Sequence, residues 1–138
     1  MIMHANIDAG RSPIAIFGWG LSGKGAASLA ERMGITYDVF DQNTDLKCKH
    51  SFTEEDALRY RTVVCSPGFA SAHPWLRLAK KENCECVTEI EFASRYWQGP
   101  LVAVTGTNGK TSVAGFLAYA LRSIGKPAVG TGNIGNCF

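Results

Sequence analysis

The stretch Pro13-Ile-Ala-Ile-Phe-Gly-Trp-Gly-Leu-Ser-Gly23 decides the fold of this chain, because it joins an apolar run to a glycine-rich turn. The run Pro13 to Phe17 predicts a buried strand, and glycines spaced as GxGxxG predict a tight turn into a helix over Lys24 to Met33. A second strand is predicted over Thr36 to Phe40, and it ends in Asp41, about 20 residues beyond the glycines. This order is the fingerprint of a β-α-β unit that holds a phosphorylated ligand at the helix N-terminus and a ribose hydroxyl at the acidic residue.

The fingerprint leaves two alternatives open. The glycines can serve only the geometry of a strand-helix junction, with no ligand involved. They can also belong to an NAD-dependent protein, because the same pattern holds NAD in dehydrogenases. What the residues favour by themselves is a phosphorylated, nucleotide-containing ligand at this turn.

A second glycine-rich segment, Val102-Ala-Val-Thr-Gly-Thr-Asn-Gly-Lys-Thr-Ser112, points to a nucleotide polyphosphate. Leu101 to Val104 predict a buried strand and Val113 to Ile124 predict a helix, so the turn between them would aim backbone N–H groups at one spot. In such a loop Lys110 supplies a positive charge to the β- and γ-phosphates, and the Thr111 hydroxyl ligates Mg²⁺.

This loop departs from the general pattern GxxxxGK[ST]. The first glycine of that pattern would fall at position 104, which is Val104, and Gly106 stands three residues before Gly109. The segment is therefore either a compact variant of the phosphate loop or a chance Gly-Lys-Thr in an ordinary turn. We favour the phosphate loop, because strand, turn and helix follow in the order that the mechanism needs.

The chain between the two glycine segments predicts alternating strands and helices. Further strands are expected at Cys48 to Phe52, Arg61 to Cys65 and Cys86 to Thr88, and helices at Thr53 onward, Pro74 to Asn83 and Ile90 to Trp97. We therefore expect an α/β fold: a Rossmann-like, mostly parallel five-stranded sheet in residues 1–98, then the first β-loop-α-β of a P-loop ATPase domain in residues 99–138. The carboxyl ends of the strands would bring Gly18 to Gly23, Asp41 and Ser66 to Gly68 to one crevice.

Composition and charge narrow the class of protein. The 138 residues are 46% hydrophobic, and 14 basic residues nearly balance 12 acidic ones without blocks of either sign, so nucleic-acid binding and membrane insertion are not expected. Five cysteines, an odd number, argue against a disulfide framework, and Cys84-Glu-Cys86 has the wrong spacing for zinc. Met1 to Ser12 lack the apolar run of a signal peptide and are expected to be a loose leader. Reduced thiols without a signal peptide favour a cytoplasmic location.

Two smaller features have simple structural interpretations. His73 precedes Pro74 at a predicted helix start, and it is expected to be a turn or cap residue rather than an acid-base catalyst. Trp75 and Trp97 are expected in the core or between domains.

Together these motifs resemble the Mur ligases of peptidoglycan synthesis, and within them the D-glutamate-adding type, from about Pro13 to the last residue. The segments that carry the resemblance are Gly18 to Gly23, Asp41, Ser66 to Gly68, His73-Pro74, Thr88 to Phe92, Val104 to Ser112 and Gly132 to Gly135. The alternatives are another Mur ligase and a non-catalytic NAD-type binding module.

The resemblance implies a role for each matching residue. The UDP part of UDP-N-acetylmuramoyl-L-alanine would meet Gly20, Leu21, Ser22, Gly23, Asp41 and Gln42, and its muramoyl-alanine arm would pass Gly68 and Asn133. ATP would be held by Thr107, Asn108, Gly109, Lys110, Thr111 and Ser112, with Lys110 catalytic and Thr111 on Mg²⁺. In this family ATP activates the substrate carboxylate as an acyl phosphate, which the amine of D-glutamate then attacks.

The resemblance also implies a longer protein. A ligase of this type has three domains, so we expect residues 1–98 to be its UDP-substrate domain and residues 99–138 to be the start of its ATP-binding central domain. We expect this stretch to be inactive alone and the complete ligase to be a monomer.

Overall fold

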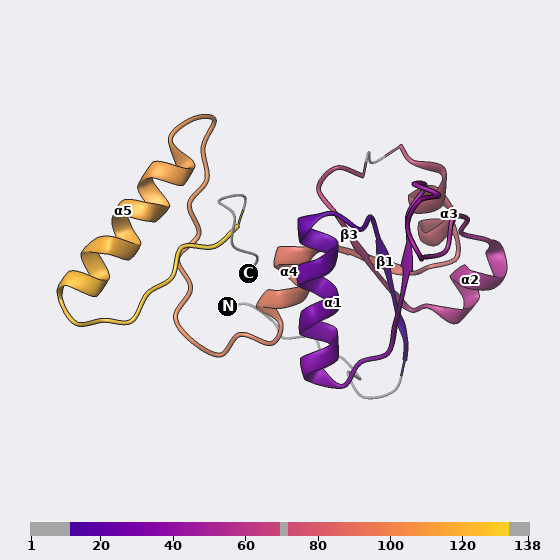
Figure 1. The fold of residues 1–138 in the computed structure, drawn as a ribbon, viewed down its shortest axis with the longest axis horizontal. Helices are drawn as coiled ribbons and strands as arrows, with labels where there is room; N and C mark the ends of the chain where they lie inside the picture. Colours follow the sequence, from indigo (N-terminus) through magenta and orange to yellow (C-terminus); the bar gives the residue numbers. More distant parts are fainter. Residues whose placement is uncertain (1–11, 70–71, 133–138) are drawn as a thin grey trace. The chain divides into compact units, whose positions relative to one another are not determined.

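The chain divides into two compact units, Met1–Tyr96 and Trp97–Phe138 (Figure 1). The structure, a computed structural model, describes residues 12–69 and 72–132. Every strand found in the described residues belongs to the first unit.

The first unit is built on a four-stranded sheet in the order β2-β1-β3-β4, and all of its pairings are parallel. The strands are β1 (Ile14–Phe17), β2 (Tyr37–Phe40), β3 (Thr62–Cys65) and β4 (Glu85–Thr88). The chain runs from β1 to β2 on one side and then crosses back to β3 on the other side. The topological switch of the sheet therefore lies between β1 and β3.

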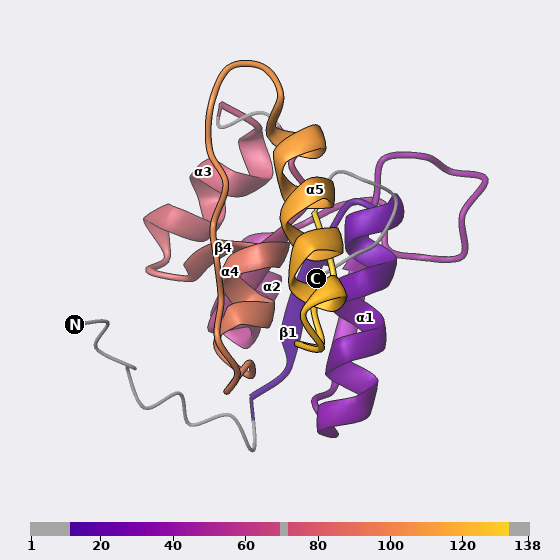
Figure 2. The same cartoon turned by 90° about the vertical axis from the view of Figure 1, so that its left-hand side faces the viewer.

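Helices cover both faces of this sheet, as parallel strands require. The helices are α1 (Leu21–Met33), α2 (Glu54–Arg59), α3 (Pro74–Lys81) and α4 (Glu89–Ser94). In Figure 1 α1 and α4 lie on one side of β1 and β3, and α2 and α3 lie on the other; Figure 2 looks from the side of α1 and α4. The expected Rossmann-like α/β fold is confirmed for this unit.

Successive side chains of β1 point to opposite faces of the sheet and belong to two different hydrophobic cores. Ile14 and Ile16 face α1, where three buried alanines, Ala26, Ala27 and Ala30, let the helix approach the sheet closely. Ala15 and Phe17 face the opposite core, which is aromatic. There the fully buried Phe17 ring meets the rings of Phe40, Phe52 and Trp75 edge-on, with centroids 5.8, 4.8 and 5.6 Å away. Each such buried ring contributes about 1.5–3 kcal/mol.

Two helix starts were predicted correctly from their capping residues. Thr53 caps α2 in a capping box, in which its side chain accepts from Asp56 N while the Asp56 carboxylate accepts from Thr53 N. His73 Nδ1 accepts a hydrogen bond from Trp75 N at 3.2 Å and caps α3, with Pro74 at the first helical position. The interpretation of His73 as a cap residue is therefore confirmed.

The predicted fifth strand at Cys48 to Phe52 is wrong. The segment makes one parallel bridge, between Lys49 and Phe40 on the outer edge of β2, and then turns away. Its side chains explain this, because Phe52 alone turns into the aromatic core while its polar neighbours stay partly or fully exposed. A segment with one core-facing side chain gains too little from burial to extend the sheet.

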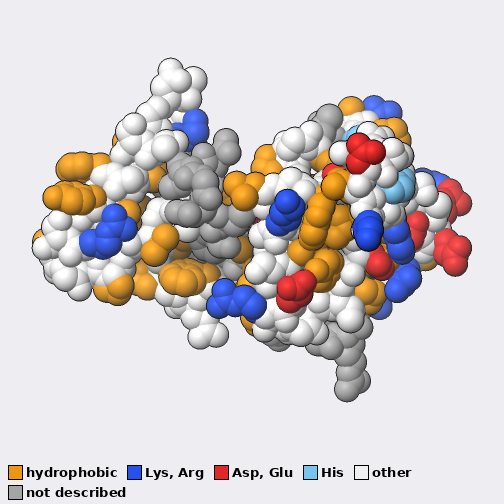
Figure 3. Space-filling view, viewed as in Figure 1, with side chains coloured by type: hydrophobic (Ala, Val, Ile, Leu, Met, Phe, Trp, Pro, Cys, Tyr) orange, Lys and Arg blue, Asp and Glu red, His pale blue; other side chains and the backbone are white. Residues whose placement is uncertain are grey.

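The second unit contains one helix in its described part, α5 (Lys110–Ser123). The strand predicted at Leu101 to Val104 is not formed, and no strand follows α5 within residues 124–132. A strand needs a neighbour to pair with its backbone, and no strand lies in residues 97–132 to provide one. Ala118 is the buried hydrophobic residue of this stretch, and hydrophobic side chains show on its surface (Figure 3).

The two tryptophans expected in the core or between domains differ in exposure. Trp75 is buried in the aromatic core, whereas Trp97 is 52% exposed and donates its indole N–H to Pro100 O at 3.2 Å. None of the helices in the described part of the chain has the length and apolar character needed to cross a bilayer.

Candidate nucleotide-binding site

The candidate site lies at the topological switch between β1 and β3. The turn Gly18 to Gly23 follows the carboxyl end of β1, and Ser66 follows that of β3. Ser66 N donates to Phe17 O at 3.0 Å, and Ser66 Oγ donates to Gly18 O at 3.4 Å, so the two turns are joined. Open α/β sheets bind ligands at such switch points.

The three glycines of the turn are needed for different reasons. Gly18 has φ 92°, and a Cβ there would lie 3.0 Å from Ser66 Oγ. A Cβ on Gly23 would lie 1.9 Å from Gly18 O, so this glycine allows α1 to pack against the turn. Gly20 has an extended backbone and nothing within 4 Å of the place of a Cβ. The junction geometry explains Gly18 and Gly23, while the open space at Gly20 suits close approach of a ligand.

The N-terminus of α1 suits an anion. Its N-cap is Gly20, no side chain caps it, and its first turn has no acidic residue. The helix dipole places roughly half a positive charge at this end. Leu21 is 58% exposed and Ser22 is half-buried. This turn therefore offers backbone N–H groups and partial positive charge to a phosphate.

Asp41 ties the glycine turn to the end of β2. Its Oδ2 accepts from Trp19 N at 2.7 Å and its Oδ1 accepts from Asn43 N at 2.9 Å. An ionised carboxylate has about four acceptor positions, so further ones are left for a ligand. Gln42 follows on the surface. Sequence reasoning missed the Trp19 N–H, because a backbone donor leaves no signature in the side-chain pattern.

The remaining predicted residues of this site are distributed as follows. Gly68 lies exposed beyond β3, two residues from Ser66, with open space around it. Asn133 lies outside the described residues. Next to this turn the rings of Phe69 and His73 are 4.4 Å apart, and Phe69 also packs on Phe17 at 5.5 Å. The structure thus brings the glycine turn, Asp41 and the turn after β3 together.

In the second glycine-rich loop, the Lys110 side chain folds back and donates hydrogen bonds to the loop's own backbone. Lys110 Nζ donates to Gly106 O at 2.5 Å and to Thr107 O at 3.1 Å. Gly109 is the N-cap of α5 with φ 77°, a left-handed conformation that favours glycine, and no side chain caps this helix. Thr107, Asn108, Gly109, Lys110, Thr111 and Ser112 are all exposed. An ammonium group and uncapped N–H groups at one loop fit a nucleotide phosphate.

The same unit offers little to a metal ion by itself. All 12 acidic residues of the chain precede Trp97, and the basic residues after it are Lys110, Arg122 and Lys126. Proteins usually hold Mg²⁺ through one or two carboxylates together with substrate phosphates. In this unit the Thr111 hydroxyl is an oxygen that can serve as a Mg²⁺ ligand, and no carboxylate side chain accompanies it.

The described cysteines do not form a reactive centre. Cys48, Cys65, Cys84 and Cys86 are free thiols. Burial raises the pKa of Cys65 to about 12, which keeps it protonated at neutral pH. Cys84 donates its S–H to Ala57 O and Tyr60 O, both at 3.1 Å. Within residues 12–69 and 72–132, no group of three His, Cys, Asp or Glu side chains is placed to hold a metal ion.

The comparison with known proteins identifies relatives of this chain, although no protein-family profile matches it. A protein of Chlamydia muridarum is 32% identical over 136 residues, covering 91% of this chain and 33% of that protein. Proteins of Aquifex aeolicus and Christiangramia forsetii are 35% and 34% identical, and they cover 89% and 91% of this chain. Each is a UDP-N-acetylmuramoylalanine–D-glutamate ligase. The chain is a homologue of these ligases.

The resemblance drawn from the sequence motifs is thereby confirmed. A match over 91% of the chain includes residues of both units, so the D-glutamate ligase homology extends to the segment that carries Lys110. The chain spans about a third of the length of these ligases.

Proposed function

We propose that this chain is the N-terminal part of an ATP-dependent ligase that adds D-glutamate to UDP-N-acetylmuramoyl-L-alanine in the cytoplasm. The observation that carries the proposal is the uncapped glycine turn at the β1/β3 switch, in a chain whose relatives are D-glutamate ligases. Residues 1–98 are the UDP-substrate domain, and residues 99–138 begin the ATP-binding central domain.

In the first unit, the diphosphate of the substrate binds the backbone of Gly20 to Gly23 at the start of α1. Open space at Gly20 and the absence of a side-chain cap support this placement. Asp41 and Gln42, at the end of β2, meet the uracil side. Gly68 and Asn133 line the path of the muramoyl-alanine arm.

In the second unit, residues Thr107 to Ser112 hold the phosphates of ATP. Lys110 exchanges its two carbonyl partners, Gly106 O and Thr107 O, for phosphate oxygens and neutralises charge on the transferring group. Thr111 contributes its hydroxyl to Mg²⁺. When bound, ATP supplies the phosphoryl group that activates the substrate carboxylate for attack by the amine of D-glutamate.

A titration tests the ligand of the first unit. We expect UDP-N-acetylmuramoyl-L-alanine and UDP to bind saturably, with backbone amide shifts at Gly20 to Gly23 and Asp41 in NMR spectra, and NAD not to bind. Saturable NAD binding without UDP binding would instead make this unit a dinucleotide-binding module.

One substitution separates binding from folding in this test. Gly20→Asp places a favoured N-cap residue where the backbone is extended and the space is open, so the fold should be kept or stabilised. Its carboxylate occupies the anion position, and UDP binding should be lost. Ser28→Asp adds the same charge at an exposed position of α1 and should bind UDP normally.

A second substitution tests the ATP loop in a ligase that contains this chain. Lys110→Ala should abolish ATP-dependent turnover and leave the affinity for the UDP substrate unchanged, because the two nucleotides bind different units. Normal turnover of the variant would remove this loop from the mechanism.

A further inference from the structure

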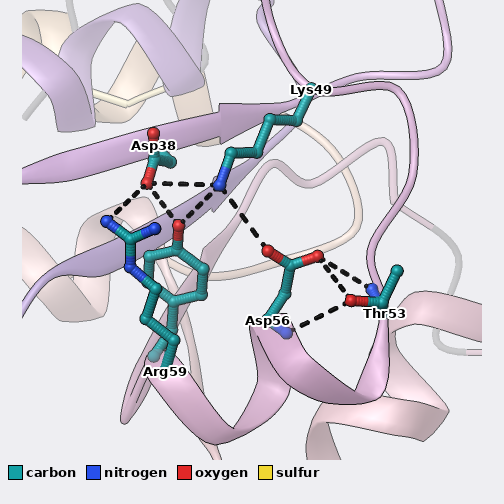
Figure 4. A network of polar contacts seen from close by, with 6 residues as sticks. Asp38, Lys49, Thr53, Asp56 and Arg59 are labelled. Carbon is teal, nitrogen blue, oxygen red and sulfur yellow. Dashed lines mark hydrogen bonds and ion pairs between the residues drawn. The ribbon is translucent and has the colours of Figure 1, made fainter.

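The side chain of Lys49 anchors the segment 41–53 between β2 and α2 through several polar contacts. Lys49 Nζ lies 3.0 Å from Tyr60 Oη, 3.5 Å from Asp38 Oδ2 and 3.6 Å from Asp56 Oδ1 (Figure 4). The same ammonium lies 5.1 Å from the ring centroid of Phe40 and 5.5 Å from that of Tyr60. Side chains from β2, from α2 and from Tyr60, the C-cap residue of α2, thus converge on Lys49.

The partners of Lys49 are themselves fixed. The Tyr60 ring is buried, and its hydroxyl donates to Asp38 Oδ2 while accepting from Lys49. Arg59 adds a second cation 3.7 Å from Asp38 Oδ2, so two carboxylates face two cations. The hydrogen bond from Tyr60 lowers the pKa of Asp38, and the bond to Tyr60 raises the pKa of Lys49. The cluster is therefore charged at neutral pH.

The backbone of Lys49 in turn holds Asp41. Lys49 N donates to Val39 O at 2.9 Å, and Lys49 O accepts from Asp41 N at 2.9 Å. His50 Nδ1 lies 3.0 Å from Asp41 O. The Asp41 carboxylate accepts from Trp19 N in the glycine turn. A continuous series of hydrogen bonds thus runs from the Lys49 cluster through Asp41 to the start of α1.

We propose that Lys49 is a positioning residue for the uridine diphosphate site. Anchored by Asp38 and Tyr60, it fixes Asp41, and Asp41 fixes the glycine turn through the Trp19 N–H, although Lys49 itself does not touch the ligand. The identity of the ligand rests on the proposed function; the positioning of Asp41 and Trp19 does not.

Binding of UDP to three variants tests this role. Lys49→Ala should raise the dissociation constant about tenfold, the equivalent of roughly 1.4 kcal/mol, measured by calorimetry. Lys49→Arg should restore most of the affinity, because it keeps the cation. Lys81→Ala removes another surface lysine, one that pairs with Glu54 at 3.2 Å, and should leave the affinity unchanged.

Hydrogen exchange in the ligand-free protein gives the second measurement. In Lys49→Ala the amides of Trp19 and Asp41 should exchange faster relative to the amide of Ile16 in β1. Val87→Ala, which opens the core on the α1 side of the sheet, should lower overall stability without changing that ratio or the UDP affinity.

The outcomes separate the two proposals. An unchanged exchange ratio at Trp19 and Asp41 in Lys49→Ala would overturn the positioning role, and so would an unchanged UDP affinity in a wild-type protein that binds UDP. Failure of the wild-type protein to bind UDP would overturn the proposed function, while the exchange ratio would still decide whether Lys49 positions Asp41.

Discussion

The two glycine-rich segments of this chain have similar sequences and different structures. In the first, an apolar run, a glycine turn and a helix become β1, Gly18 to Gly23 and α1, and four residues of α1 are buried. In the second, the helix α5 forms after Gly109, but the apolar run 101–104 is not a strand and Ala118 is the buried residue of the helix. A helix with its N-terminal glycine is specified locally, whereas a strand depends on its neighbours.

Charge separates the two units as well. The first unit carries all 12 acidic residues and 11 of the 14 basic ones, which gives it a formal charge of −1. The second carries three basic residues and no acidic one, which gives +3. The second unit is therefore the one with an excess of positive charge, which suits a polyphosphate, whereas the site proposed in the first unit would hold an anion through backbone N–H groups.

Hydrogen exchange should show the largest difference between the units. The amides of β1 pair with both neighbouring strands inside the core, so they should open only with global unfolding. The amides of residues 101–104 have no strand partner in the described part of the chain. We expect protection factors that differ by on the order of 10³. Equal protection in a monomer would show that residues 101–104 belong to a sheet and would contradict this difference between the two units.

A matched pair of phenylalanine substitutions tests the same contrast in stability. Phe17→Ala removes a fully buried ring from the aromatic core and should cost about 3–5 kcal/mol of unfolding free energy. Phe116→Ala removes a ring that is 72% exposed on α5 and should change the unfolding free energy by less than about 0.5 kcal/mol. Urea denaturation monitored by circular dichroism measures both. A large loss in Phe116→Ala would mean that α5 is covered in solution.

A matched pair of glycine substitutions should give effects of opposite sign. Gly23→Ala forces a Cβ to 1.9 Å from Gly18 O and should cost about 3 kcal/mol. Gly115→Ala meets nothing within 4 Å inside α5 and should stabilise that helix by about 0.5–1 kcal/mol. Thermal melts and helical content report the two effects. A stabilising Gly23→Ala would contradict the close packing of α1 on its turn.

The smallest effect concerns pH. Arg95 makes a bidentate pair with Glu85, at 2.9 and 2.7 Å, and its hydrogen bonds lower the pKa of Glu85. A lowered folded-state pKa gives stability that is present above the unfolded value, 4.5, and is lost as the pH falls through the folded value. Because Glu85 is half exposed, Glu85→Gln should cost only about 0.5 kcal/mol at pH 7.

The control for this prediction is to measure the unfolding free energy of both proteins over a range of pH. As the pH falls from 7 through the folded-state pKa of Glu85, the difference in unfolding free energy between the wild-type protein and Glu85→Gln should shrink, whereas a difference that stays constant would contradict the ion-pair explanation. The helical content of α5 should not change over this range, because residues 97–138 have no acidic side chain.

Local patterns predicted the parts of the fold that local forces determine. The caps at Thr53 and His73 were predicted correctly, because side chains adjacent in sequence set them. The strand before the first glycine turn was also predicted correctly, and there β2 and β3 provide the pairing that its apolar run requires. The strands at 48–52 and 101–104 were predicted wrongly. In those segments apolar or β-branched residues suit a strand, but tertiary pairing decides whether one forms.

The sequence predicted which residues form the candidate site, but not the hydrogen bonds and ion pairs that join them. Glycine spacing and the carboxyl ends of strands placed Gly18 to Gly23, Asp41 and Ser66 at one edge of the sheet. The contacts of Asp41 with Trp19 N, and of Lys49 with Tyr60 and Asp38, join residues 11 to 22 positions apart. No periodicity in the sequence reports such pairs, because they depend on how the loop 41–53 folds back on β2.

The unequal crowding around the three glycines gives a rule for redesigning this turn. Gly18 and Gly23 leave no room for a side chain, so a combinatorial library that varies them would consist mostly of misfolded proteins. Position 20 tolerates a side chain in space, and Leu21 is exposed beside it. A library that tests the proposed nucleotide site for altered preference can therefore be confined to these two positions, which keeps it small enough to screen completely.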